Sequence, residues 1–389
     1  MKLLRCLLNS PKWPLRVLGI AKLSDFDFLK TLHPDLSDNQ LLDRLRKQSK
    51  DSDEILAEHR RQVACEKELA RVLHNLNVGY RIIKRIDVAG ASTSGWADLV
   101  IAIGGDGTFL LASKLITNNK TPIIGINPHP RTCNIFTVPV SDSGAEIERI
   151  FEKLHAGDFA VLMRSRIRTI MTGEGLYREP FHLHEKSRTQ EERRIDALTR
   201  STQRKIADAL QPRRRVLPWL ALNEVFMSEF VAARTITLTV EVDDEETFTV
   251  RSSGMCVCTG SGSRFWFRTM NLKTVETVRV LVTIATGRIL SAKESNELLR
   301  KYHNNLLFSP EDSRMAYTIY EMYRNSRYST RISEKRKCRR IKIKSSGFDA
   351  ALVLDGSLSV PFNDGSTAVF EICPECSLKN LIFCSNKFI

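Results

Sequence analysis

The chain has 389 residues, of which 42% are hydrophobic, so it can bury a large core, and its length favours two domains over one. No stretch reaches the roughly 18 uninterrupted apolar residues that a membrane-spanning helix needs, so we expect a soluble protein without a membrane partner. The net charge of +14 suggests phosphate binding. Its Lys and Arg residues gather at 186–215 and 331–344 without aromatic residues for base stacking, which favours a solvated surface and no nucleic-acid partner.

The N-terminal segment is basic, with Lys2, Arg5 and Lys12 and no acidic residue before Asp25. This bias is typical of a mitochondrial leader, which would occupy residues 1–14 and direct the protein to the matrix. The alternative is an ordinary basic start in a cytoplasmic protein. The residues alone leave both interpretations open.

Residues 15–158 alternate between apolar strands and amphipathic helices. We expect strands near 15–22, 80–87, 97–105 and 121–127, and helices near 38–47, 53–75, 108–116 and 141–159. The last helix begins with an S-x-x-E capping box, Ser143 to Glu146. Continuous apolar strands separated by helices predict an α/β domain whose doubly wound parallel sheet has helices on both faces.

From residue 159 to 389 the pattern changes to many strands, which predicts a β-rich, β-sandwich-like second domain. The strand-like stretches include 161–173, 221–229, 235–244, 248–260, 315–323, 338–346, 349–356 and 366–372. Two helical stretches, 273–290 and 291–308, interrupt them, and a charged insertion lies at about 177–213. The C-terminal segment could return to the first domain.

The nine cysteines lack signal-peptide flanks, which favours free thiols in a reducing compartment. Cys256 and Cys258 lie one residue apart in a strand-like run, so both point to one face, as core residues do. Cys373 and Cys376 have the C-x-x-C spacing of a zinc knuckle. Although four thiolates could hold zinc, core packing is favoured, and we predict no metal ligands in the protein.

The strand 97–105 ends in Gly104-Gly105-Asp106-Gly107-Thr108, the motif most indicative of function. Glycines allow positive φ, so successive N–H groups could form an anion-binding nest, and a helix beginning at Thr108 would add its dipole. Among groups that bind anions, Asp106 is better explained as a proton acceptor or an indirect magnesium partner. The alternative is a tight turn after a strand.

At these residues the sequence resembles the kinases with a G-G-D-G-T motif, which include NAD kinases and lipid kinases. The segment ALNEVF (221–226) is similar to the Asn-Glu pair with which NAD kinases bind the dinucleotide. CVCTGSGSRFW (256–266) is similar to their T-P-T-G-S-T-A-Y segment, with Trp266 in place of tyrosine. The family's upstream R-G-D-G is RSSG here, which leaves Ser253 where a carboxylate would contact substrate.

These departures, together with several stretches in matching order, resemble the animal mitochondrial branch of NAD kinases. The resemblance implies ATP-dependent phosphorylation of the 2′-hydroxyl of the adenosine ribose of NAD to give NADP, with Mg²⁺ accompanying ATP, in a homodimer. It assigns Asp106 as the catalytic base and places the binding residues in an interdomain cleft. These binding residues are Gly104, Gly105, Gly107, Thr108, Asn127, Asn223, Glu224, Thr259, Gly262 and Ser263. The alternatives are a lipid kinase of this superfamily, a noncatalytic dinucleotide sensor and a nucleic-acid-binding protein.

Overall fold

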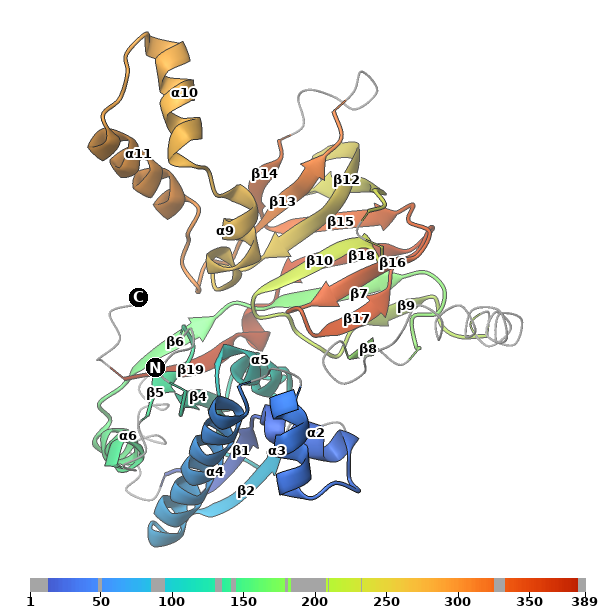
Figure 1. The fold of residues 1–389 in the computed structure, drawn as a ribbon. Coiled ribbons are helices and arrows are strands. Elements are labelled where there is room, and N and C mark those ends of the chain that lie inside the picture. Colours follow the sequence, from blue (N-terminus) through green and yellow to red (C-terminus); the bar gives the residue numbers. More distant parts are fainter. Residues whose placement is uncertain are drawn as a thin grey trace. The chain divides into compact units, whose positions relative to one another are not determined.

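A computed structural model describes residues 13–47, 51–84, 95–129, 135–140, 145–178, 181–182, 208, 210–231, 233–324 and 333–383. The chain separates into two compact units (Figure 1). The first comprises Met1–Met163 with Leu378–Ile389, and the second comprises Arg164–Ser377. Within the described ranges, no helix combines the length and apolar character needed to cross a membrane.

The first unit contains a largely parallel sheet in the order β2-β1-β3-β4-β19-β6, with β5 also paired to β4. Each of β3 and β4 consists entirely of buried residues, because apolar side chains occupy both faces. The C-terminal strand β19 pairs in parallel with β4. The strands are β1 (Arg16–Ala21), β2 (Gly79–Lys84), β3 (Leu99–Ile103), β4 (Pro122–Asn127), β5 (Val138–Pro139), β6 (Ala160–Arg164) and β19 (Leu378–Ile382).

Helices cover both faces of this sheet. The core cluster of one face joins Leu99, Ile101 and Ile124 to residues of α4 (Ser52–Asn75) and α6 (Ala145–Ala156). Successive strand residues point to opposite faces, so Gly125 lies on the other side. There a Cβ would meet the ring of Phe109 from α5 (Asp106–Lys114) at 3.0 Å. The predicted α/β domain with helices on both faces is confirmed. Two further helices are α2 (Asp25–Leu32) and α3 (Asp38–Lys47).

Two boundaries differ from the sequence-based expectation. Helix α5 begins at Asp106, not at Thr108, because the carbonyl of Gly105 already accepts the N–H groups of Thr108 and Phe109. The single strand expected at 161–173 is two strands, and the first of them, β6, pairs in the parallel sheet. The first unit therefore continues past Asp158 to Met163. Ser143 of the expected capping box, and most of the charged insertion, lie outside the described residues.

The second unit contains one 12-stranded sheet, in which β8-β17-β16-β10-β12-β11-β15-β18-β7-β9 follow one another and β13 and β14 extend from β12. All its strand pairs with a defined register are antiparallel. The strands are β7 (Ile167–Thr172), β8 (Phe181–His182), β9 (Arg214–Val216), β10 (Glu224–Glu229), β11 (Ile236–Val242), β12 (Glu246–Cys258), β13 (Met315–Met322), β14 (Lys335–Cys338), β15 (Arg340–Ser345), β16 (Ala350–Leu354), β17 (Leu358–Pro361) and β18 (Thr367–Ile372). The predicted β-rich domain is confirmed, and it is built from one continuous sheet.

Successive residues of each strand point to opposite faces of the sheet, and the apolar side chains of one face pack together in a common core. In β12, Met255 and Val257 belong to the main core, whereas Cys256 and Cys258 point the other way and pack against Phe267. Complete burial raises the pKa of both thiols well above the usual value, so they stay neutral. The prediction that this C-x-C pair is core packing is confirmed.

Three helices lie between β12 and β13 in the chain: α9 (Trp266–Asn271), α10 (Val275–Thr286) and α11 (Ala292–Asn305) (Figure 1). Helix α10 is capped by the side chain of Thr274 and by the left-handed Gly287. Ser291 and Glu294 form a capping box at the start of α11. None of the residues of α10 is buried, although most of them are apolar.

We expect Gly125→Ala to destabilise the first unit. The added Cβ would lie 2.6 Å from the Thr137 methyl carbon and 2.9 Å from the Phe136 carbonyl oxygen, so the packed layer must shift. Overpacking of this kind typically costs about 1–3 kcal/mol, which would appear as a lower melting temperature by circular dichroism. Gly79→Ala is the matched control, because its Cβ would have no neighbour closer than 3.4 Å. Equal melting temperatures for the two variants would contradict this packing.

Candidate active site

Gly104 ends strand β3 in a conformation that requires glycine. Its φ of +149° is in the region that L side chains rarely adopt, and its N–H donates to the Ile126 carbonyl at 2.8 Å. A Cβ would lie 2.6 Å from the Thr108 hydroxyl oxygen and 2.9 Å from Cβ of Lys22. The turn therefore joins the ends of three neighbouring strands closely, which only a residue without a side chain permits.

Gly105 and Gly107 do not have the positive φ values that the predicted anion-binding nest requires. Gly105 is the N-cap of α5 with an extended backbone, and Gly107 is exposed in the first helical turn. A Cβ on Gly107 would meet nothing within 4 Å, so the surface at this helix N-terminus is open. The expected succession of positive-φ glycines is thus limited to Gly104. The open N-terminus of α5, with its helix dipole, is the anion-binding feature that remains.

Asp106 is held by the loop that follows β4. One carboxylate oxygen accepts the N–H of Phe136 at 3.0 Å, and the other accepts the N–H of Ile135 at 3.1 Å. The residue is half-buried. Because each carboxylate oxygen accepts one of these hydrogen bonds, the two bonds together fix the orientation of the group. The sequence did not reveal this contact, which joins residues about 30 positions apart.

The buried Asn127 closes the end of β4. Its side-chain oxygen accepts the N–H of His129 at 2.9 Å, so this predicted binding residue has a structural partner. Burial, and next the positive charge of Lys22, lower the pKa of His129, which favours the uncharged ring. Lys22, beside Gly104, therefore supplies the positive charge at this edge of the sheet.

Gln62 of α4 links this region to the end of β3. Its side chain is fully buried and donates to the Ile103 carbonyl at 3.2 Å, directly before Gly104. It also donates to Glu66 at 2.9 Å and contacts the His129 ring at 3.4 Å. Because the N–H of Lys22 donates to the same Ile103 carbonyl, two elements hold the last peptide of β3 in place.

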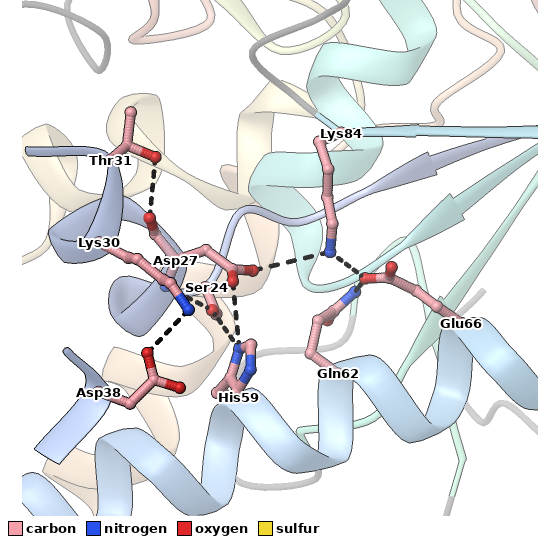
Figure 2. A network of polar contacts seen from close by, with 9 residues as sticks. All are labelled: Ser24, Asp27, Lys30, Thr31, Asp38, His59, Gln62, Glu66 and Lys84. Atoms are coloured by element: carbon pink, nitrogen blue, oxygen red, sulfur yellow. Dashed lines mark hydrogen bonds and ion pairs between the residues drawn. The ribbon is translucent and has the colours of Figure 1, made fainter. Parts of the chain in front are cut away.

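A wider polar network supports Gln62 (Figure 2). Glu66 pairs with Lys84 at 2.7 Å, and Lys84 approaches Asp27 at 3.8 Å. Asp27 lies 3.6 Å from His59, whose ring is hydrogen-bonded to the Ser24 hydroxyl at 2.8 Å. The network connects α2, α4 and β2, and so it positions the helix that carries Gln62.

In the second unit, Asn223 and Glu224 form a turn at the start of β10 that is organised by Asp355. The Asp355 carboxylate accepts the N–H groups of Leu222 at 3.0 Å, Asn223 at 2.8 Å and Glu224 at 3.2 Å. Asp355 itself has a φ of +47° at the end of β16. All three peptide groups are buried, so the carboxylate supplies acceptors that water cannot. Sequence reasoning missed Asp355.

The segment 259–263 packs directly on this turn. The N–H of Thr259 donates to the Asn223 carbonyl at 2.8 Å, and its hydroxyl donates to the Leu222 carbonyl at 2.6 Å. A Cβ on Gly262 would lie 2.0 Å from the Asn223 carbonyl oxygen, so only glycine fits. Ser263 is buried, and its hydroxyl donates to the Gly260 carbonyl at 2.7 Å. The structure thus brings together the predicted dinucleotide-binding residues of the second unit.

Two side chains near this turn are available to a ligand: Asn223 has a buried hydrogen-bond acceptor, and Trp266 has an exposed aromatic ring. The side-chain oxygen of Asn223 is buried and has no hydrogen-bond partner among the described residues, which is unusual for a native protein. The ring of Trp266 is 52% exposed and packs edge-on against Phe226 at 4.7 Å. An amino or hydroxyl donor of a ligand would satisfy Asn223, and a base could stack on the exposed indole.

Ser253, which replaces the expected acid, binds a carboxylate from a neighbouring strand. Its hydroxyl donates to Glu321 of β13 at 2.8 Å, and both residues are accessible. Glu321 has a φ of +50°, an uncommon value for a residue with a side chain. The carboxylate that is absent from position 253 is therefore present beside it.

Arg166 is the largest side chain among those that are fully buried, and sequence reasoning missed it too. Its Nε donates to the Cys376 carbonyl at 2.5 Å. Burial lowers its pKa to about 10, while the charges of Cys376 and Asp355 act in the opposite direction. The guanidinium thus remains charged and balances the buried Asp355.

The described ranges contain no group of three or more His, Cys, Asp and Glu residues that could hold a metal ion. The four cysteines considered for zinc lie in two separate places. Cys256 and Cys258 pack with Phe267, whereas Cys373 and Cys376 contact each other at 3.0 Å.

Comparisons with known proteins agree with this geometry. Residues 44–131 match the family model of the ATP-NAD kinase N-terminal domain. The chain is 31% identical to "NAD kinase 2, mitochondrial" of Homo sapiens over 95% of its length and 84% of that protein. It is also 31% identical to the protein of the same name from Rattus norvegicus, over 95% of this chain and 88% of that one. The crystal structure of yeast NADH kinase complexed with NADH matches with a TM-score of 0.50 and 14% identity, covering 95% of this chain and 84% of that one.

A parallel α/β unit with a glycine turn at a helix N-terminus, followed by an antiparallel β-rich unit, defines a kinase of the G-G-D-G-T class. The chain belongs to the NAD kinase family. The predicted resemblance, including that to the animal mitochondrial branch, is confirmed, and so is the predicted class of enzyme.

We expect Asp355→Asn to disturb the Asn223–Glu224 turn. The amide keeps one acceptor oxygen and turns an NH₂ group toward the buried peptide N–H groups, at a cost of about 1–3 kcal/mol. The measurements are the melting temperature and the dissociation constant for NAD, and we expect the first to fall and the second to rise. Asp349→Asn, at an exposed position beside the same strand, is the control and should change neither. Unchanged NAD affinity in a stable Asp355→Asn protein would contradict the positioning role.

Proposed function

We propose that this NAD kinase family member transfers the γ-phosphoryl group of ATP to the 2′-hydroxyl of the adenosine ribose of NAD, giving NADP. The observation that carries this assignment is Asp106. Its carboxylate is oriented by the Ile135 and Phe136 amides at the open N-terminus of α5, beside the exposed Gly107. A proton acceptor and an anion-binding surface are thus adjacent, which phosphoryl transfer to a hydroxyl requires.

The glycine turn would bind the phosphates of the substrates. Gly104 aligns the turn, and Gly105, Gly107 and Thr108 lie at the start of α5, where the helix dipole favours negative charge. The open surface at Gly107 lets phosphate oxygens approach the backbone. Lys22, whose Cβ lies beside Gly104 and whose ammonium group approaches Glu58 at 3.9 Å, adds a positive charge to this region.

Asp106 would accept the proton of the ribose 2′-hydroxyl as the new phosphorus–oxygen bond forms. The hydrogen bonds from the Ile135 and Phe136 N–H groups restrict the rotation of the Asp106 side chain. The carboxylate therefore needs no reorganisation during the transfer. Positioning of the hydroxyl and the phosphoryl group supplies the rest of the rate enhancement.

In the second unit, Asn223 and Glu224 would bind the dinucleotide, with Thr259, Gly262 and Ser263 supporting them. The buried Asn223 oxygen can accept from an amino group or a hydroxyl of the ligand. The Glu321 carboxylate, which accepts a hydrogen bond from the Ser253 hydroxyl, would take the role of the acid that is absent from position 253. The side chain of Asn127 would instead act indirectly, because its oxygen bonds the His129 amide.

Mg²⁺ would enter bound to the phosphates of ATP and would neutralise their charge. Asp106 offers hard carboxylate oxygens at the start of α5, and such oxygens suit Mg²⁺ directly or through water. Mg²⁺ prefers one or two carboxylates and substrate phosphates over an all-protein cage.

We propose a mitochondrial location, supported by the names of the human and rat relatives and by the basic N-terminal segment. The expected leader, residues 1–14, lies almost entirely outside the described residues. Import assays with and without these residues would test it.

The expected turnover of Asp106→Asn is lower by about 10² or more, with NAD still bound, because a positioned general base contributes that much. Since the amide would turn an NH₂ group toward one of the Ile135 and Phe136 N–H donors, the melting temperature must be measured as well. The assay is incubation with Mg-ATP and NAD, read by an NADP-specific coupled enzyme. Near-normal turnover in a folded variant removes Asp106 from this role.

The kinase assay with a lipid as competing acceptor, together with binding measurements, separates the alternative functions. Phosphorylation of a lipid in preference to NAD would favour the lipid kinase. NAD binding without turnover by the unmodified protein would favour a noncatalytic sensor, and salt-dependent shifts of short RNA or DNA would favour a nucleic-acid-binding protein.

We also propose a homodimer, and α10 offers a surface for it. This helix is well capped but has no buried residue, and Leu281 and Ile284 are 60% and 78% exposed. An exposed cluster of this kind is typical of an interaction surface. We expect Ile284→Glu to convert the dimer to a monomer in sedimentation velocity, whereas Glu276→Gln on the same helix leaves it unchanged. A dimer that survives Ile284→Glu would exclude this face.

A further inference from the structure

The segment Cys373-Pro374-Glu375-Cys376, which follows β18, has no part in the kinase chemistry described above. It forms a single 3₁₀ turn in which the N–H of Cys376 donates to the Cys373 carbonyl at 3.0 Å. The two thiol sulfurs lie 3.0 Å apart. The backbone of the turn therefore already brings both side chains to the same side.

Other thiols of this unit have different surroundings. Cys256, Cys258 and Cys338 are buried in apolar clusters, and burial raises the pKa of Cys338 to about 12. In the C-x-x-C turn, by contrast, Pro374 and Glu375 are exposed and Cys376 is only half-buried. Cys376 is therefore reachable by a reagent from solvent.

The two sulfurs of the pair differ in their surroundings. Cys373 is 1% exposed, and burial raises its pKa to about 12. Cys376 is the accessible thiol, and the positive charge of Arg166 lies close to it. Because Cys376 is the more accessible of the two thiols, a reagent in solvent reaches Cys376 first, and the buried Cys373 is placed to react second.

We propose that Cys373 and Cys376 form a reversible disulfide by exchange with a low-molecular-weight disulfide such as glutathione disulfide. The Cys376 thiolate attacks one sulfur of the reagent, whose S–S bond breaks and releases one glutathione thiolate. Cys373, after losing its proton, attacks the Cys376 sulfur of the mixed disulfide and releases the second glutathione. Two protein thiols are oxidised and one reagent disulfide is reduced to two thiols, which balances the two-electron exchange.

The turn needs little rearrangement for this reaction. A disulfide requires the sulfurs to approach to about 2.05 Å and tolerates the short Cα separation of residues three apart in a turn. In a compartment that keeps thiols reduced, such a bond is usually transient and regulatory. The pair is therefore a modification site rather than a structural staple.

Oxidation would act on the dinucleotide-binding turn through Arg166, a step that rests on the proposed function. The Cys376 carbonyl accepts the Arg166 Nε–H at 2.5 Å, and Arg166 balances the charge of Asp355. Asp355 in turn holds the peptide groups of Asn223 and Glu224. Closing the disulfide tightens the turn and draws the Cys376 carbonyl away from Arg166, which loosens the Asn223–Glu224 turn and weakens NAD binding.

The first experiment maps the disulfide on the full chain. The protein is equilibrated with mixtures of reduced and oxidised glutathione, alkylated with iodoacetamide, digested with trypsin and analysed by mass spectrometry. Both cysteines fall in one tryptic peptide, residues 345–379. We expect this peptide to lose two hydrogens and carry no alkyl group after oxidation, and to regain two alkyl groups after dithiothreitol.

Matched variants complete the mapping. Cys376→Ser should give no disulfide in this peptide, and Cys338→Ser, at another buried thiol of the same unit, should leave it unchanged. Persistent alkylation of both cysteines in oxidised samples, or stable glutathione adducts on each, would overturn the proposed pair.

The second experiment measures the dissociation constant for NAD by calorimetry in both redox states. We expect oxidation to weaken binding about fivefold or more in the unmodified protein, the lower end of typical coupling between two sites, and to have no effect in Cys376→Ser. Equal affinities in a fully oxidised and a reduced sample would overturn the coupling through Arg166. Failure of the reduced protein to make NADP would count against the proposed function alone, because the peptide mapping and the binding measurement do not depend on turnover.

Discussion

The candidate site of the first unit depends on two backbone N–H groups that hold the carboxylate of Asp106. They belong to Ile135 and Phe136, in the segment after β4, and they orient a group that follows β3 in the chain. The adjacent ends of the parallel strands β3 and β4 make this contact possible. Gly104 then lets the turn pass close to Thr108 and Lys22, and Gln62 holds the peptide that precedes it. Each of these features serves to place one acid at the N-terminus of α5.

The second unit uses a carboxylate in the same physical way, but on three peptide groups. Asp355 accepts the buried N–H groups of residues 222–224, and Gly262 allows the segment 259–263 to pack on the Asn223 carbonyl. A buried charge of this kind is stable only when hydrogen bonds and an opposite charge surround it, and Arg166 provides the latter. Because Arg166 also binds the Cys376 carbonyl, the turn that carries the two neighbouring thiols is part of the same polar core.

Membership of the NAD kinase family explains why these two groups of residues occur in one chain. The departures from the usual motifs have structural counterparts. Where the acid of R-G-D-G is absent, Ser253 binds Glu321 of the adjacent strand β13. Where tyrosine is replaced, Trp266 keeps an exposed aromatic ring that packs on Phe226. The carboxylate is thus supplied from another position in the chain, which pairing between neighbouring strands permits, whereas the aromatic ring keeps its position and changes only its type.

The sequence by itself determined the α/β alternation, the β-rich second unit, the glycine turn after β3 and the adjacent Asn223 and Glu224, because these follow from local periodicity, from turn chemistry and from motifs within a few residues. Only the tertiary structure decided that Ile135 and Phe136 orient the carboxylate of Asp106, and that Asp355 and Arg166 organise the Asn223–Glu224 turn. The reason is that these contacts join residues from about 30 to more than 130 positions apart. Their existence depends on strand order and register, which no local pattern encodes.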